Sequence, residues 1–139
     1  MGKLLERLKD PARSGVYRVS RADETVKAVR GSELSFAIIP ISEKTELMQT
    51  IAKALGFPNW FGGNWDALED CLTDFSWREA AGHVLVFEGS RGLAEDDAGI
   101  LIDVLTAAAE FWAGQGKPFC AVFVDPKRVL ELADLFREA

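Results

Sequence analysis

Three short runs of this sequence are apolar at nearly every position, and they limit its possible folds more than any other feature. The runs are FAIIPI at 36–41, HVLVF at 83–87 and FCAVFV at 119–124. A strand that is apolar throughout has to be covered on both faces, which is typical of a parallel sheet with helices packed against it. Pro40 cannot donate a hydrogen bond to a neighbouring strand, so it should lie at a strand end or at an unpaired position.

The segments around these runs carry apolar residues at the three-and-four spacing of amphipathic helices. Helices are predicted over 3–9, 22–30, 43–55, 65–75, 93–113 and 125–139. Ser42 is the expected N-cap of the helix over 43–55, and Gly56 is expected to end that helix. Pro126 suits the first helical position of the last helix, because a first-turn residue needs no backbone N–H.

Strands that alternate with helices predict an α/β fold built on a small parallel β-sheet. The three apolar runs should be its core strands. Residues 16–19 alternate as a short strand does and are a candidate fourth strand at an N-terminal edge. At 139 residues, the chain has the length of a single domain.

Charge and composition narrow the possible partners and the expected location. A net charge of −6 argues against direct nucleic-acid binding, which requires a basic patch, and suits a basic partner. No apolar run approaches the roughly 18 residues needed to span a membrane, and the N-terminus lacks the apolar core of a secretory signal. Cys71 and Cys120 are expected to be reduced and buried, although the sequence leaves a bridge between them open. We expect a cytoplasmic protein.

An aromatic turn is predicted in the stretch PNWFGGNWDALEDCLTDFSW, at 58–77. Trp60 and Phe61 precede a glycine pair, and glycine takes left-handed backbone angles without steric cost. Asn64 is a good N-cap for the helix that follows. Large aromatic residues usually belong to the core, and we expect Trp65 to be partly buried.

The helix after this turn carries an acidic row. Asp66, Asp70 and Asp74 are four residues apart and should stack on a face away from the apolar stripe. Like charges at this spacing destabilise an isolated helix by a few tenths of a kcal/mol per pair. The row is therefore either a binding surface or an ordinary solvated helix face.

The residues at 60–73, WFGGNWDALEDCLT, closely resemble the central loop and helix of the barstar family, small intracellular inhibitors of ribonucleases. The family pattern is aromatic-aromatic-Gly-x-Asn-x-Asp-Ala-Leu-x-Asp-Cys-Leu, and each fixed position is matched. We expect a single barstar-like domain over 1–139, and the resemblance covers its core, about 34–124. The N-terminal extension over 1–33 and the C-terminal helix over 125–139 have no obvious counterpart in the short family members.

The resemblance also implies a function. The chain is expected to inhibit an intracellular or toxin ribonuclease, as an immunity protein, by covering the active site with its acidic helix and the preceding loop. The expected partner-binding residues are Trp60, Phe61, Gly62, Asn64, Asp66, Glu69, Asp70, Asp74 and Glu110. Asp66 and Asp70 fall on the matching aspartates of the family, whereas Asp74 lies outside the matched string. Glu69 stands where the family has an aromatic residue.

Several of these residues also have a plain structural interpretation. Gly62 matches a glycine of the family's contact loop and equally suits a turn. Asn64 is first of all a cap. Glu110 lies near a further acidic contact of the family, although Phe111 can take that place in another register.

Catalysis and metal binding have little support. A nucleophilic triad requires a base, and the single histidine, His83, begins a strand. Two carboxylates one helical turn apart do not oppose each other across a sugar as in a glycosidase. A metal site built from Asp66, Asp70 and His83 follows no known spacing. We expect a non-enzymatic monomer without cofactor or metal. The alternative function is that of a barstar-fold interaction module that binds a different basic protein. A small carboxylate hydrolase is the third class considered.

Overall fold

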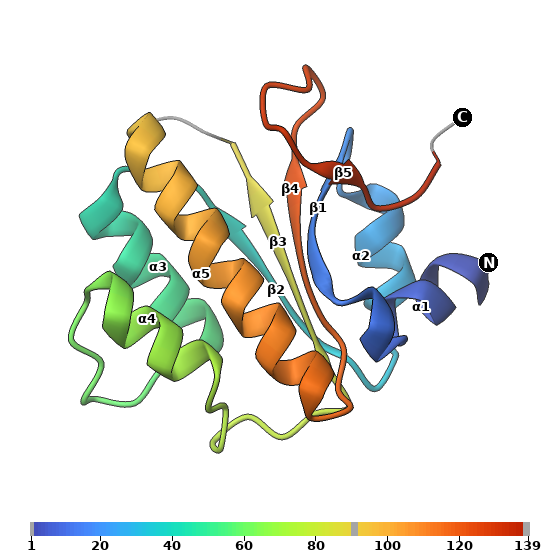
Figure 1. The fold of residues 1–139 in the computed structure, drawn as a ribbon, viewed down its shortest axis with the longest axis horizontal. Helices are drawn as coiled ribbons and strands as arrows, with labels where there is room; N and C mark the ends of the chain where they lie inside the picture. Colours follow the sequence, from blue (N-terminus) through green and yellow to red (C-terminus); the bar gives the residue numbers. More distant parts are fainter. Residues whose placement is uncertain (1, 90–91, 138–139) are drawn as a thin grey trace.

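The computed structural model describes residues 2–89 and 92–137. Its strands form one parallel sheet in the order β2-β3-β4-β1-β5 (Figure 1). The strands are β1 (Gly15–Val19), β2 (Ser35–Pro40), β3 (His83–Glu88), β4 (Phe119–Val124) and β5 (Ala133–Asp134). The predicted α/β fold with a parallel sheet is confirmed. The fourth strand, β1, forms as expected, but it lies between β4 and β5, so within the described residues the edge on this side is the two-residue β5.

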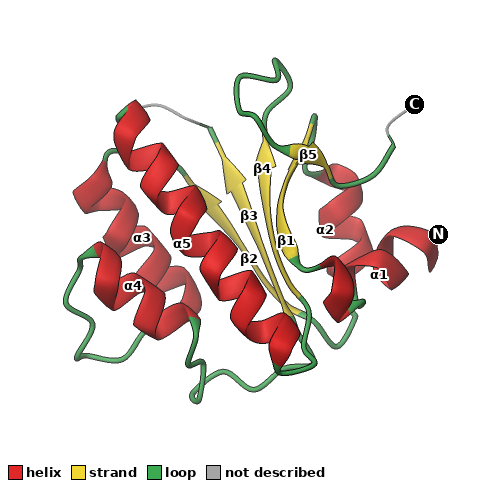
Figure 2. Cartoon of the chain, in the orientation of Figure 1, coloured by secondary structure: helices red, strands yellow, loops and turns green. Residues whose placement is uncertain are grey.

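Helices cover both faces of the sheet (Figure 2). They are α1 (Gly2–Leu8), the 3-10 turn η1 (Pro11–Arg13), α2 (Asp23–Val29), α3 (Lys44–Leu55), α4 (Trp65–Leu72) and α5 (Glu95–Gly114). Helices α3, α4 and α5 pack on one face, and α1 and α2 pack on the other. Among the described residues, no helix is long and apolar enough to cross a membrane.

The side chains of the central strands alternate between two separate cores, which explains why these strands are apolar throughout. In β3, Leu85 and Phe87 belong to the core beneath α3, α4 and α5. Val84 and Val86 belong to the second core, beneath α1 and α2, where Leu135 from the C-terminal segment joins them. Residues 84–87 of β3 are therefore each buried by one helical layer or the other.

Pro40 ends the edge strand β2, as its missing donor requires. The N–H groups of Ser35 and Ile41 donate to carbonyls on the β3 side, at Gly82 and Glu88. Because the direction of the N–H alternates along a strand, residue 40 faces the free edge of the sheet. No ladder hydrogen bond is lost there.

The prediction of a helix over 125–139 is wrong, because the described residues after β4 contain no helix. The Asp125 carboxylate accepts hydrogen bonds from the N–H groups of Val129 (3.0 Å) and Leu130 (2.8 Å). Arg128 takes a left-handed φ of 54°. This turn reverses the chain and returns it as β5 beside β1.

Two smaller expectations also have clear outcomes. The N-cap of α3 is Glu43 and not Ser42, because the Glu43 carboxylate accepts from the N–H groups of Thr45 and Glu46. Cys71 and Cys120 are both buried free thiols, as expected. Burial raises the pKa of the Cys71 thiol to about 11 and that of Cys120 to about 12.

Candidate protein-binding surface

The start of α4 is fixed by local interactions. Gly63 has a φ of +72°, which a residue with a side chain rarely adopts. The next residue, Asn64, is extended, and its side-chain oxygen accepts from the Ala67 N–H at 2.8 Å. The predicted N-cap is confirmed. The left-handed turn belongs to Gly63 and not to Gly62, where an added Cβ would make only ordinary contacts.

One face of α4 is anchored in the core. Leu68, Cys71 and Leu72 are buried, and the indole N–H of Trp112 on α5 donates to the Leu72 carbonyl at 2.7 Å. The helix ends at Leu72, and Phe75 follows with a left-handed φ of 50° and a buried ring. The position of α4 against α5 is therefore set by packing and by a hydrogen bond to its last turn.

The opposite face of α4 is acidic and exposed. Asp66 and Asp70 are exposed one helical turn apart, and Glu69 is exposed beside them. Among the described residues, none of these three carboxylates makes an ion pair. The spacing predicted that Asp74 would continue this row on the helix. That prediction is wrong, because α4 ends two residues before Asp74. Its exposed carboxylate instead accepts from the Ser76 N–H at 3.3 Å.

A cluster of aromatic rings holds the loop that precedes α4. Phe57 packs edge-on against Phe61 (4.9 Å between centroids) and against Trp77 (5.9 Å). The Trp77 indole N–H donates to the carbonyl of Leu55, at the end of α3, at 3.1 Å. The Trp60 ring lies edge-on to Trp77, with 6.4 Å between the ring centroids, and Trp60 is 59% exposed. The loop therefore presents a large aromatic side chain from a supported backbone.

Trp65, in the first turn of α4, is half-buried, as expected. The Lys44 ammonium group lies 5.7 Å from the centroid of its indole ring. This residue contributes to the packing of α4 against its surroundings. The sequence pattern did not identify the supporting roles of Phe57 and Trp77, although both flank the matched string.

Glu110 and Phe111 lie on α5, directly before Trp112, whose indole reaches α4. Both are exposed, Phe111 by 41%. The Phe111 ring packs edge-on against Trp112 at 5.1 Å. The Phe111 ring therefore lies beside the indole that reaches α4, and a contact role for Glu110 stays a prediction.

His83 is not part of this surface. Its ring lies within the aromatic core, 4.2 Å from Phe75 and 5.6 Å from Trp112. Burial, assisted by the charges of Arg78 and Lys117, lowers the pKa of His83 to about 4. Across residues 2–89 and 92–137, no three His, Cys, Asp or Glu side chains are grouped so as to hold a metal ion.

The fold and this surface define a class of protein: a small parallel α/β protein whose acidic helix follows an aromatic-glycine turn. The family model described as Barstar (barnase inhibitor) matches residues 33–124. This match covers more than half of the chain, and the chain belongs to the barstar family, which is a family of inhibitors. The match includes β2, α3, α4, β3, α5 and β4, whereas β1, α1, α2 and β5 lie outside it.

Proposed function

We propose that this protein inhibits a ribonuclease by covering its active site with α4 and the loop before it. The observation that carries the proposal is the exposure of the Asp66 and Asp70 carboxylates. Both occupy aspartate positions of the family pattern, and both are exposed and free of ion pairs within the described residues. They lie on a helix whose other face is firmly packed.

Ribonucleases offer the complementary chemistry. Their active sites hold phosphate groups through cationic side chains, and Arg in particular pairs with a carboxylate through two parallel hydrogen bonds. Carboxylates one turn apart on a rigid helix can occupy the positions of two such phosphates. Trp60 would add an aromatic contact beside them, of the kind that often dominates binding energy.

Long-range charge supports fast association in the same proposal. The chain carries a net charge of −6, which attracts a basic enzyme. Because screening shortens the reach of charge to about 8 Å near physiological ionic strength, the association rate should fall as salt rises. Dissociation should depend instead on the close, desolvated pairs.

The test is inhibition of purified barnase-type ribonucleases in an RNA-cleavage assay. Wild type should inhibit at a one-to-one ratio, and Asp70→Ala should weaken inhibition by at least ~2 kcal/mol, or about thirtyfold. That magnitude comes from charge pairs in protein complexes, barnase–barstar among them. Asp23→Ala is the matched control, because it removes an exposed aspartate from α2, on the other side of the sheet. An Asp70→Ala variant that inhibits as well as wild type would place the contact elsewhere.

A second candidate function is binding to a basic protein that is not a ribonuclease. It is favoured by Glu69, which replaces an aromatic contact of the family with a further charge. Failure of the wild-type protein to inhibit any ribonuclease, together with co-purification of a basic non-nuclease partner, would support this alternative. Glu69→Ala should then weaken binding to that partner.

A further inference from the structure

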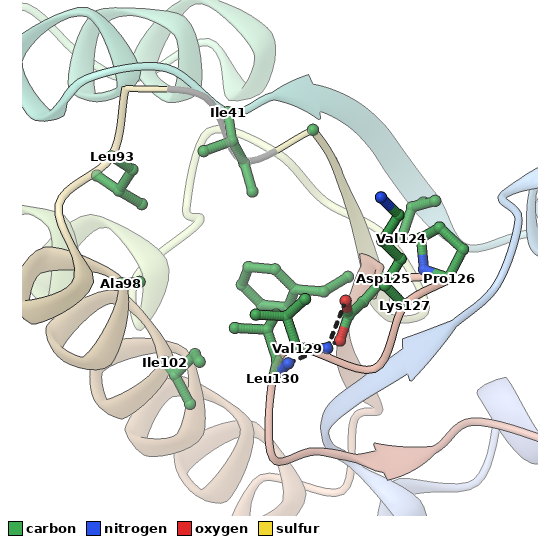
Figure 3. A pocket seen from close by; sticks show the side chains of 12 residues that line it. Ile41, Leu93, Ala98, Ile102, Val124, Asp125, Pro126, Lys127, Val129 and Leu130 are labelled. Atoms are coloured by element: carbon green, nitrogen blue, oxygen red, sulfur yellow. Dashed lines mark hydrogen bonds between the residues drawn. The ribbon is translucent and has the colours of Figure 1, made fainter.

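A cavity of about 490 Å³ lies at the carboxyl ends of β2, β3 and β4 (Figure 3). Its walls come from three places: Ile41 after β2, the first half of α5, and the segment after β4. Leu93, just before α5, and Ile102 on α5 face it, and from the last segment Val129 and Leu130 face it. The lining is mostly apolar.

Both the position and the size of this cavity are typical of ligand sites. In open parallel sheets, ligands bind outside the carboxyl ends of the strands, and small-molecule pockets measure about 300–1,000 Å³. No residue of α4 or of its preceding loop lines it. Much of one wall, Asp125 to Leu130, lies beyond residues 33–124, which match the barstar family.

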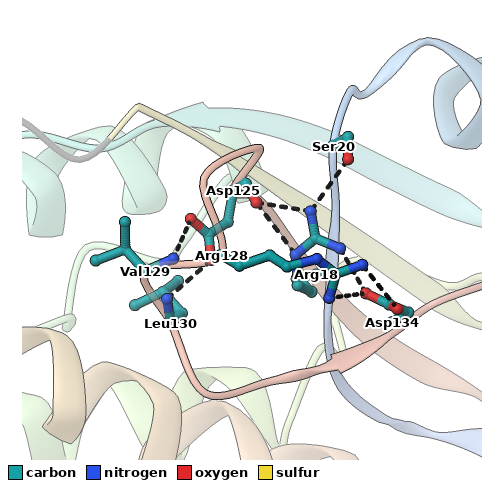
Figure 4. A network of polar contacts seen from close by, with 7 residues as sticks. All are labelled: Arg18, Ser20, Asp125, Arg128, Val129, Leu130 and Asp134. Carbon is teal, nitrogen blue, oxygen red and sulfur yellow. Dashed lines mark hydrogen bonds and ion pairs between the residues drawn. The ribbon is translucent and has the colours of Figure 1, made fainter.

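That wall is held in place by hydrogen bonds. Both carboxylate oxygens of Asp125 accept from backbone, at Val129 and Leu130. The Asp125 carbonyl accepts from the Arg18 guanidinium at 2.7 and 3.1 Å, and Arg18 is only 1% exposed (Figure 4). A ligand would therefore meet a wall that is already ordered, which lowers the entropic cost of binding.

The lining has one cationic group that is available to an anion. Asp125 and Lys127 are the charged side chains among the described lining residues. The Asp125 carboxylate is engaged by the backbone, whereas Lys127 is exposed and makes no ion pair within the described part of the chain. Beside it, Val129 leaves 77% of its apolar side chain in water, where a bound apolar group would cover it.

We propose that this cavity binds a small apolar carboxylate, of the class of medium-chain fatty acids. The aliphatic chain lies between α5 and the segment after β4, against Leu93, Ile102 and Leu130. The carboxylate lies at the mouth and accepts a charge-assisted hydrogen bond from Lys127. This site is independent of the proposed ribonuclease contact.

The experiment is a titration of the full chain with octanoate, followed by amide chemical shifts, with octan-1-ol and octylamine as matched probes. Saturable shifts should appear at the lining residues, and octanoate should bind about tenfold more tightly than octan-1-ol. Octylamine should bind most weakly. Absence of saturable shifts at the lining residues, or octylamine binding as tightly as octanoate, would overturn the proposal.

Two variants separate the charge from the cavity. Lys127→Gln should remove the preference for octanoate over octan-1-ol, while Lys53→Gln, an exposed lysine on α3, should keep it. Ala98→Phe should fill the cavity and abolish binding of both probes, with an unchanged circular dichroism spectrum as the check on folding. Lys127 is exposed, so its variant decides the question even if Ala98→Phe does not fold. A Lys127→Gln variant that still prefers octanoate to octan-1-ol would overturn the proposal.

Discussion

The carboxylates of α4 and those of the C-terminal segment occupy opposite environments. Asp66 and Asp70 point into solvent without an ion pair in the described structure. Asp125 and Asp134 are held within the fold: Asp125 accepts two backbone hydrogen bonds, and Asp134 pairs with Arg18 and with Arg128 (Figure 4). The same side chain serves two different purposes in one small protein.

Acids that stabilise the fold can therefore be told apart from acids that are available for binding. Hydrogen bonds from Arg18 and then Arg128 hold the pKa of Asp134 below its ordinary value, so folding favours its charged form. Neighbouring carboxylates on α4 repel one another and contribute nothing comparable to the fold. Substitutions should therefore affect stability in one group and binding in the other.

The largest effect on stability is expected for Arg18→Ala. It should lower the free energy of unfolding by about 3 kcal/mol, because a buried cation and its hydrogen bonds to Asp125 and Asp134 are lost. Urea denaturation measures this change. Arg21→Ala, which removes an exposed arginine, should stay within about 0.5 kcal/mol of wild type. Equal stability of the two variants would remove the distinction between the two groups of acids.

Asp125→Ala should have the next largest effect. Loss of the acceptor for two backbone N–H groups should cost about 1–2 kcal/mol of unfolding free energy, and Asp125→Asn should cost less, because the amide keeps one acceptor oxygen. Faster hydrogen exchange at the amides of Val129 and Leu130 would locate the change. Protection of these amides at wild-type levels in Asp125→Ala would contradict the assigned role.

The contribution of Asp134 should depend on pH. Its pKa is lowered in the folded state from an ordinary value of 3.8, so its stabilising effect is present above that value and is lost as pH falls through the folded pKa. The difference in unfolding free energy between wild type and Asp134→Asn should therefore shrink on acidification from neutral pH. Urea denaturation of both proteins at a series of pH values measures this difference. A difference that grows towards acid pH would contradict the prediction.

The smallest effect is expected on α4. Asp70→Asn should raise the free energy of unfolding by about 0.3 kcal/mol, because it relieves repulsion from Asp66 one turn earlier. Added salt should reduce the gain, since both carboxylates are exposed. Thermal unfolding at low and high salt measures it. A clear destabilisation would show that Asp70 has a structural partner.

The parallel sheet and the start of α4 could be predicted because their determinants are local or simply apolar. The strands at 83–87 and 119–124 are apolar because helices cover both of their faces, whereas the edge strand at 36–41 leaves Ile38 40% exposed. Asn64 caps its own helix. The contact roles expected for Asp66, Asp70 and their neighbours stay predictions, because they depend on a partner.

The C-terminal segment could not be predicted in this way. Val129, Leu130, Ala133 and Phe136 have the spacing of a helix, yet a turn forms there. The decisive contact joins Arg18 to Asp125 across 107 residues of sequence, which no local pattern records. Asp74 was misplaced for a related reason, since Phe75 leaves the helix to reach the aromatic core.

The place of β1 in the sheet has a consequence for biosynthesis. Gly15–Val19 leaves the ribosome before the other strands of this sheet, but its two neighbours, β4 and β5, begin at Phe119 and Ala133. β1 must therefore remain without its partner strands until β4 has been translated. Contacts this distant in sequence form slowly, and an unpaired strand edge is prone to aggregate. The nascent chain therefore depends on β4 and β5 to cover the edges of β1.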